Sequence, residues 1–233
     1  MAAATAMDLA TEVVMVVDRA RVALVAGATG LVGREILAAL LADKTYSTVH
    51  CVGRRNVELN HPKLIQHVVD FSALPTLPHV DDCFIALGTT IKVAGSQAAF
   101  RAIDLEAVEA LAQAAHAQGA TKLGVVSAMG ADPRSAIFYN RVKGEMETSL
   151  IRMGFGSLVI ARPSLLDGHR QTLQQAPRFG ERLGLALMRW AAPVIPSNYQ
   201  AIDAKDVARS LVEAVQTGTP GVVTLLSGDM QSH

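Results

Sequence analysis

The sequence predicts a doubly wound α/β domain, in which helices cover both faces of a parallel sheet. Its 233 residues are half apolar, enough for one compact domain with a substantial core. Short apolar runs of strand length alternate with longer segments of helical periodicity, and a glycine-rich turn follows the first run. Parallel strands need crossover connections of this kind, so the alternation favours a parallel sheet over a set of hairpins.

Strands are expected where short apolar runs end in turn residues, at residues 21–27, 49–52, 64–69, 83–87, 122–127, 157–162 and 222–226. Helices are expected where apolar side chains recur every three or four positions, at residues 31–42, 96–118 and 136–153. Gly119 and Gly154 follow two of these helices as C-caps. Another helix opens at Asp203, with Asp206 placed as in a capping box. The link 53–63 is short and polar and contains Pro62, so the usual crossover helix is expected to be short or missing there.

A single domain is expected over residues 21–233. Residues 1–20 are interpreted as a leader, because the apolar run 13–17 is too short for a signal peptide or an integral membrane segment. This leader is a frayed arm or the product of an upstream start codon; an extra strand or a swapped arm is the alternative. Residues 170–196 lack the strand pattern and are predicted to form a small C-terminal lid. The basic amphipathic segment 170–190 packs on the core or covers a subunit, membrane or hydrophobic partner.

Charge and cysteine content narrow the classes of partner. Lys+Arg and Asp+Glu number 21 each, so the net charge is zero and no nucleic acid partner is expected. Cys51 and Cys83 lie in apolar runs, which indicates a reducing compartment and predicts a cytoplasmic protein. His50 precedes Cys51, but neighbouring strand residues point to opposite faces of a sheet, so no metal site is expected.

The glycine-rich turn Gly27-Ala-Thr-Gly30-Leu-Val-Gly33 lies between the first strand and the first helix. A helix amino terminus presents unpaired N–H groups and a positive dipole end, which hold a pyrophosphate. Glycines let the backbone turn tightly and approach the phosphates. The turn, with Thr29, Leu31 and Val32 inside it, therefore predicts dinucleotide binding in a Rossmann fold; a glycine-rich packing turn is the alternative.

A second motif combines Ser127, Tyr139 and Lys143. Tyr139 and Lys143 are four residues apart and share one face of a predicted helix. The lysine charge and the first helical turn are expected to lower the pKa of the phenol. Ser127 ends a strand at the sheet edge where such folds bind ligands, and it could bond a substrate carbonyl while Tyr139 delivers a proton. The alternative is that Tyr139 packs and Lys143 is a solvated charge.

The end of the second strand predicts which dinucleotide binds. NAD-selective proteins place an acidic residue there to accept the ribose 2′-hydroxyl, whereas this chain has Arg54 and Arg55. A guanidinium binds the additional phosphate of NADP by charge-assisted bonds, and Arg34 in the first helical turn could add to it. NADP(H) is therefore expected to bind better than NAD(H), with Arg55 either contributing or pointing to solvent.

The glycine pattern, the serine and the YxxxK motif, in this order, resemble the short-chain dehydrogenases/reductases. The resemblance covers roughly residues 21–227. Four further phrases narrow it to the atypical group that includes the Tat-interacting-protein-type oxidoreductases and their bacterial relatives: Leu87-Gly-Thr-Thr90, Ser127-Ala-Met-Gly-Ala-Asp132, Phe138-Tyr-Asn-Arg-Val-Lys-Gly-Glu145 and Arg162-Pro-Ser-Leu-Leu166.

The resemblance implies that several residues contact the cofactor: Gly27, Gly30, Gly33, Leu87, Gly88, Thr89 and Pro163. It also implies that Lys143 binds the ribose and that Asp70 bonds the adenine amino group, a plain turn residue being the alternative. One departure is Asp104, which replaces an asparagine that props the active site in many relatives. This replacement weakens any inference about a proton relay.

The preferred function is NADP(H)-dependent oxidation or reduction of a carbonyl/alcohol pair of a small-molecule substrate. Two alternatives remain open: a non-catalytic dinucleotide-binding regulator or scaffold, and an epimerase or dehydratase with a tightly held cofactor. A homo-oligomer is also left open.

Overall fold

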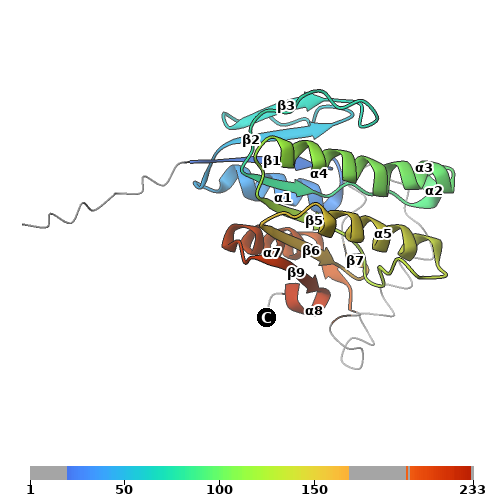
Figure 1. The fold of residues 1–233 in the computed structure, drawn as a ribbon. Coiled ribbons are helices and arrows are strands. Elements are labelled where there is room, and N and C mark those ends of the chain that lie inside the picture. The colour runs from blue at the N-terminus through green and yellow to red at the C-terminus, as the bar shows by residue number, and fades with distance from the viewer. Residues whose placement is uncertain (1–19, 168–197, 199, 232–233) are drawn as a thin grey trace, which may run out of the picture.

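The computed structural model describes residues 20–167, 198 and 200–231. A seven-stranded sheet lies at its centre, in the order β3-β2-β1-β4-β5-β6-β9, and every neighbouring pair is parallel (Figure 1). The strands are β1 Arg21–Ala26, β2 Tyr46–Gly53, β3 Leu64–Val68, β4 Asp82–Ile85, β5 Lys122–Val126, β6 Ser157–Arg162 and β9 Gly221–Leu226. The predicted doubly wound fold is confirmed. From β1 the strand order runs outward through β2 and β3 on one side and through β4, β5, β6 and β9 on the other. The strands β1 and β4 therefore flank the topological switch point, where such sheets bind ligands.

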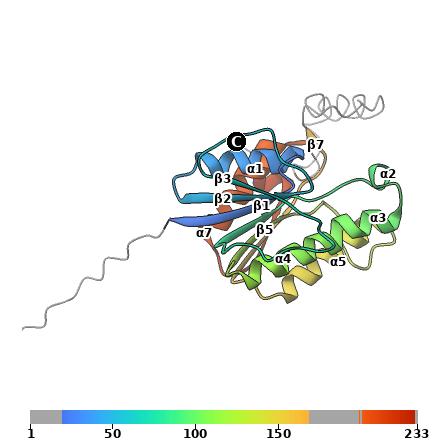
Figure 2. The same ribbon diagram turned by 90° about the horizontal axis from the view of Figure 1, so that it is seen from above.

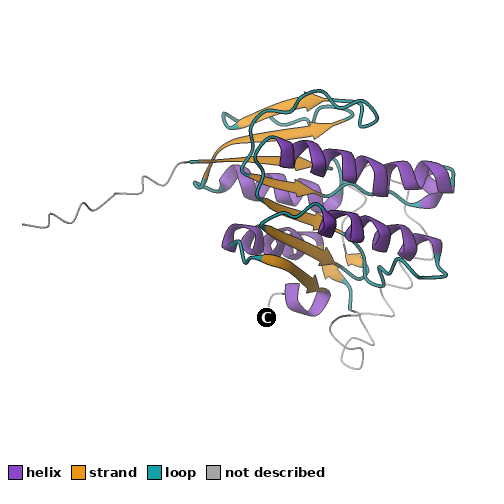
Figure 3. Cartoon of the chain, in the orientation of Figure 1, coloured by secondary structure: helices purple, strands orange, loops and turns teal. Residues whose placement is uncertain are grey.

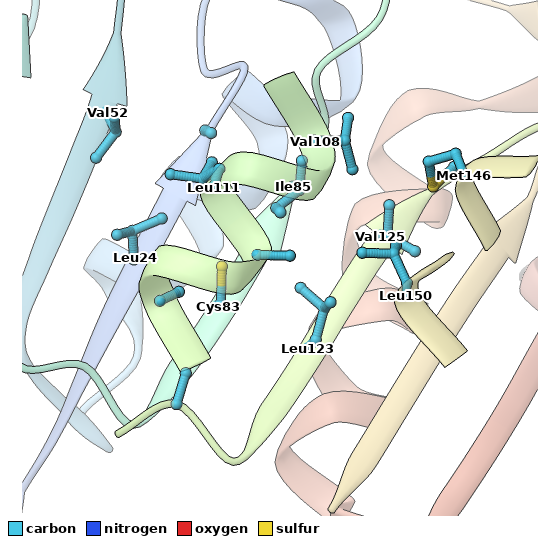
Figure 4. Packing of buried hydrophobic residues seen from close by; sticks show 14 of the residues in the cluster. Leu24, Val52, Cys83, Ile85, Val108, Leu111, Leu123, Val125, Met146 and Leu150 are labelled. Carbon is cyan, nitrogen blue, oxygen red and sulfur yellow. The ribbon is translucent and has the colours of Figure 1, made fainter. Parts of the chain in front are cut away.

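Helices cover both faces of this sheet (Figures 2 and 3). One face carries α1 (Leu31–Ala42) and α7 (Ala204–Thr217), and the other carries α4 (Ala107–Ala117) and α5 (Phe138–Arg152). Successive side chains of β1 point to opposite faces of the sheet and so contribute to two hydrophobic cores, one on each face. Leu24 and Ala26 belong to one buried cluster, and Ala23 and Val25 belong to the other. Figure 4 shows the first cluster, in which side chains of the strands meet those of α4 and α5.

The predicted helix over residues 96–118 is interrupted in the structure. It consists of α3 (Gln97–Arg101), a π-helical turn η1 (Ala102–Glu106) and α4, and it is preceded by the short α2 (Ile91–Ala94). Ser96 caps α3 by accepting the Ala99 N–H at 3.0 Å. Residues 102–106 contain no glycine or proline, the usual signals of a break, so the sequence does not reveal the π turn.

Other predicted elements agree with the structure within a few residues, and the link 53–63 carries no helix. Four short elements were not predicted: α2, β7 (Leu166–Asp167), β8 (Ile202–Asp203) and α8 (Ser227–Met230). Two-residue strands and a single helical turn are too short to show a hydrophobic period. Asp203 caps α7 by accepting the Lys205 N–H, whereas Asp206 pairs with Arg209.

The leader up to residue 19 and the predicted lid 170–196 lie outside the described residues. Within the described part of the chain, no helix is long and apolar enough to cross a membrane.

Candidate active site

The three glycines of the turn after β1 differ in how much space surrounds them. Gly27 has a φ of +87°, and a Cβ there would lie 2.3 Å from the Ala86 carbonyl oxygen. A Cβ at Gly33 would lie 2.1 Å from the Gly27 carbonyl oxygen. At Gly30 the only neighbour of a Cβ within 4 Å would be the Gly27 oxygen, at 3.2 Å. Gly27 and Gly33 are therefore required by packing, whereas Gly30 borders open space.

Gly30 is also the N-cap of α1, and no side chain caps this helix. The first N–H groups of α1 therefore remain available beside the switch point, as an anion site requires. Thr29 is exposed, Leu31 is half-buried and Val32 is buried in the core. Val32 can thus offer a ligand its backbone but not its side chain.

The loop after β4 lies against the glycine turn, since Gly27 approaches Ala86 so closely. Leu87 packs on the core, Gly88 is exposed, and the Thr89 N–H donates to Asp104 Oδ2 at 2.9 Å. A Cβ on Gly88 would lie 3.4 Å from Asp104 Oδ1 and 3.8 Å from Lys143 Nζ. The loop that the resemblance assigns to the cofactor therefore borders the predicted catalytic lysine.

Lys143 and Asp104 form a buried ion pair. Lys143 Nζ lies 2.7 Å from Asp104 Oδ1, with 4% and 1% of the two side chains exposed. Asp104 therefore belongs to the site itself. From the sequence alone, it was interpreted only as a departure from the family pattern.

Tyr139 lies beside this pair on α5, with its ring centroid 5.5 Å from that of Phe100. Burial raises the pKa of Tyr139, Lys143 lowers it and Asp104 raises it, with a net upward shift. The expectation of a lowered pKa was wrong in sign for the protein without ligand. The sequence shows the lysine four residues away but neither the burial nor the facing carboxylate.

Ser127 belongs to a neighbouring buried network. Its hydroxyl donates to Glu147 Oε1 at 2.5 Å, and Arg162 donates to both oxygens of Glu147, at 3.0 and 2.5 Å. Glu147 raises the pKa of Arg162 through these bonds. Glu147 and Arg162 were missed by the sequence analysis. The available signal was the spacing of Glu147, four residues after Lys143 on the same helix face.

The remaining predicted site residues follow the carboxyl ends of their strands. Pro163 is buried after β6, and its carbonyl accepts the Met129 N–H at 3.0 Å. Asp70, after β3, is exposed and accepts two hydrogen bonds from Ser72, which lower its pKa. Arg54 and Arg55, after β2, are exposed and make no ion pair with the described residues. The predicted site residues therefore gather at the end of the sheet where the strands have their carboxyl termini.

No group of three or more His, Cys, Asp or Glu residues in the described chain could hold a metal ion. His50 contacts His67, with Nδ1 and Nε2 2.9 Å apart, and both cysteines are free and buried.

Comparison with known proteins defines the class first. No family model matches the chain. A short-chain dehydrogenase/reductase superfamily protein from Agrobacterium tumefaciens, solved with bound NAD, superimposes with a TM-score of 0.64 at 15% identity, over 88% of this chain and 77% of that one. The fold is that of a short-chain dehydrogenase/reductase, a class of NAD(P)-binding Rossmann proteins.

The particular family follows from sequence relatives. Protein FMP52, mitochondrial, of Lodderomyces elongisporus is 31% identical over 85% of this chain and 88% of the relative. Protein HTATIP2 of Rattus norvegicus is 34% identical over 62% of each chain. The chain belongs to the FMP52 family, in the atypical short-chain dehydrogenase/reductase group. The predicted resemblance is confirmed.

The expected cytoplasmic location is contradicted by these relatives, since FMP52 proteins of several fungi are named mitochondrial. Two free, buried thiols indicate only that they form no disulfide with each other, and this holds in any reducing compartment.

Proposed function

We propose that the chain is an NADP(H)-dependent oxidoreductase that interconverts a carbonyl and an alcohol. The observation that carries this proposal is the buried Tyr139–Lys143–Asp104 cluster beside an uncapped helix amino terminus. A dinucleotide would supply hydride transfer. Its pyrophosphate would lie against Gly30 and the first N–H groups of α1, and its ribose against Lys143.

Tyr139 is proposed as the proton donor. Its hydroxyl makes no hydrogen bond with the described residues, and its raised pKa keeps the phenol protonated at neutral pH. A positioned phenol of this kind can protonate the oxygen of a carbonyl while that group is reduced.

Ser127 is proposed to bind the substrate carbonyl, but the structure sets a condition on this role. A serine hydroxyl has a single proton, and that of Ser127 is donated to Glu147. To bond a substrate oxygen, the hydroxyl must rotate away from Glu147. Glu147 would still accept two bonds from Arg162, so the rotation leaves no buried carboxylate without a donor.

The preference for NADP(H) is supported by Arg54 and Arg55. Both side chains are exposed after β2, and neither is engaged in an ion pair within the described chain. A guanidinium without an ion-pair partner can bind the 2′-phosphate of NADP(H) without first breaking an existing ion pair. One charge-assisted contact of about 1.5–3 kcal/mol corresponds to roughly 10–150-fold in affinity.

Calorimetric titration with NADPH and NADH tests binding, followed by a screen of aldehydes and ketones for NADPH consumption. Gly30→Val is expected to abolish dinucleotide binding while leaving the circular dichroism spectrum unchanged, because its side chain would enter open space at the phosphate site. Gly156→Ala is the control, at a glycine before β6 whose Cβ would have only the Thr121 carbonyl oxygen within 4 Å, at the ordinary contact distance of 3.4 Å. Unchanged affinity in Gly30→Val would leave the turn with a packing role alone.

A further inference from the structure

Asp104 is a buried carboxylate set in a π-helical turn. It is buried, and it lies in η1, between α3 and α4. Its Oδ2 holds the Thr89 N–H of the loop after β4, and its Oδ1 faces the Lys143 ammonium. Single π turns inside helices are often found at functional sites. Asp104 thus links the cofactor loop to the helix that carries Tyr139 and Lys143.

The charges that face the Tyr139 phenol come from two elements. Lys143 on α5 favours the phenolate and Asp104 on η1 disfavours it. Because the two charges lie within 2.7 Å of each other, their effects on the phenol largely cancel. The aromatic ring of Phe100, the third neighbour from α3, carries no charge. Burial is left as the dominant influence, and burial favours the neutral phenol.

We propose that Asp104 is a positioning residue that neutralises Lys143, so that Tyr139 remains a phenol and the site acts as a proton donor. The use of that proton in carbonyl reduction rests on the proposed function. The charge balance itself does not, and it can be measured without substrate or cofactor. Asp104 acts through Lys143 and through the loop at Thr89, and it need not touch a substrate.

Ultraviolet absorbance of tyrosinate during a pH titration tests the proposal, over the range in which circular dichroism shows an intact fold. The chain has three tyrosines, so the signal of Tyr139 is obtained by subtracting the titration of the same protein with Tyr139→Phe. Asp104→Asn keeps the side-chain shape and an acceptor oxygen for the Thr89 N–H. It is expected to lower the Tyr139 pKa by about one unit or more, since Lys143 is then uncompensated.

A neutral double variant, Asp104→Asn with Lys143→Gln, covers the case in which the single variant does not fold. It leaves no buried charge without a partner. Its Tyr139 pKa is expected to stay within about half a unit of that of the unaltered protein, because two cancelling effects are removed together. If Lys143 acted on the phenol without Asp104, the double variant would instead raise the pKa by a unit or more.

Glu145→Gln is the matched control, because it removes a carboxylate from the same helix that pairs with Arg101 and is not among the groups that shift Tyr139. It is expected to leave the Tyr139 titration unchanged. An unchanged pKa in folded Asp104→Asn, or a raised pKa in the double variant, would overturn the role of Asp104. Failure to bind NADPH or to reduce any carbonyl would instead count against the proposed function and leave these titrations as they are.

Discussion

The two ends of the parallel sheet each hold an aspartate, a cation and a tyrosine, yet the two clusters differ in what they leave free. At the amino end, Asp82 accepts from Arg21 Nε at 2.7 Å and from the Tyr46 hydroxyl at 2.9 Å. Arg21 Nη2 donates to its second oxygen at 2.5 Å. Both oxygens of this fully buried carboxylate are therefore satisfied.

The cluster at the carboxyl end is built from Asp104, Lys143 and Tyr139. Here Asp104 Oδ1 lies 2.7 Å from the Lys143 ammonium, and Oδ2 accepts the Thr89 N–H. The Tyr139 hydroxyl has no partner in the described chain, whereas that of Tyr46 is bonded. The comparison teaches that similar residue types are fully bonded to one another at one end, whereas at the other end the Tyr139 hydroxyl is left without a partner in the described chain.

The largest expected effect is on turnover. Tyr139→Phe is expected to lose roughly 10²–10⁴-fold in the rate of carbonyl reduction while keeping NADPH affinity, because it removes only the proton donor. Tyr46→Phe is the control from the amino end and is expected to cost about 1 kcal/mol of stability with turnover unchanged. Steady-state rates on the substrate found by screening decide it. Normal turnover in Tyr139→Phe would contradict the assignment.

Asp82→Ala is expected to lower the free energy of unfolding by about 3–5 kcal/mol, since it leaves Arg21 and the Tyr46 hydroxyl without their buried partner. Urea unfolding at constant pH measures this. NADPH affinity below the transition is expected to be unchanged, because the cluster lies at the far end of the sheet. A loss of affinity in the folded variant would show that the two ends are coupled.

Arg54→Ala and Arg21→Ala are expected to have opposite effects on NADPH affinity and on stability. Arg54→Ala is expected to weaken NADPH binding by roughly 10–150-fold, with NADH binding and stability unaffected. Arg21→Ala should show the reverse, with lowered stability and normal affinity, because it pairs with Asp82. Calorimetry and urea unfolding on both variants measure the two effects. Equal dissociation constants for the two dinucleotides in the unaltered protein would refute the NADP(H) preference.

The smallest expected effect concerns pH. Burial and the neighbouring His67 lower the pKa of His50, so the unfolded chain binds a proton more readily than the folded one. Stability is therefore expected to fall as the pH drops below about 6.5, the ordinary histidine value. His50→Gln should flatten this dependence, as judged by urea unfolding at several pH values. An identical slope in both proteins would assign the effect to other groups.

The sequence by itself determined the parallel fold, the glycine turn and the pairing of Tyr139 with Lys143. Each depends on local spacing: apolar periodicity, glycines between a strand and a helix, and two residues one helical turn apart. The arginines after β2 could also be placed at the ligand edge, because the carboxyl ends of parallel strands lie together. The catalytic roles assigned to Ser127, Tyr139 and Lys143 stay predictions.

Only the tertiary structure decided the electrostatics of the site. Asp104 is remote in sequence from Lys143, and Ser127 is remote from Glu147, so no spacing rule connects them. The prediction of a lowered Tyr139 pKa was wrong because it considered the Lys143 charge alone. It left out the opposing charge of Asp104 and the burial of the phenol, both of which raise that pKa. Local periodicity reports which face of an element is buried, whereas the balance of charges depends on which elements the fold brings within a few ångströms, where desolvation and Coulomb interactions are strongest.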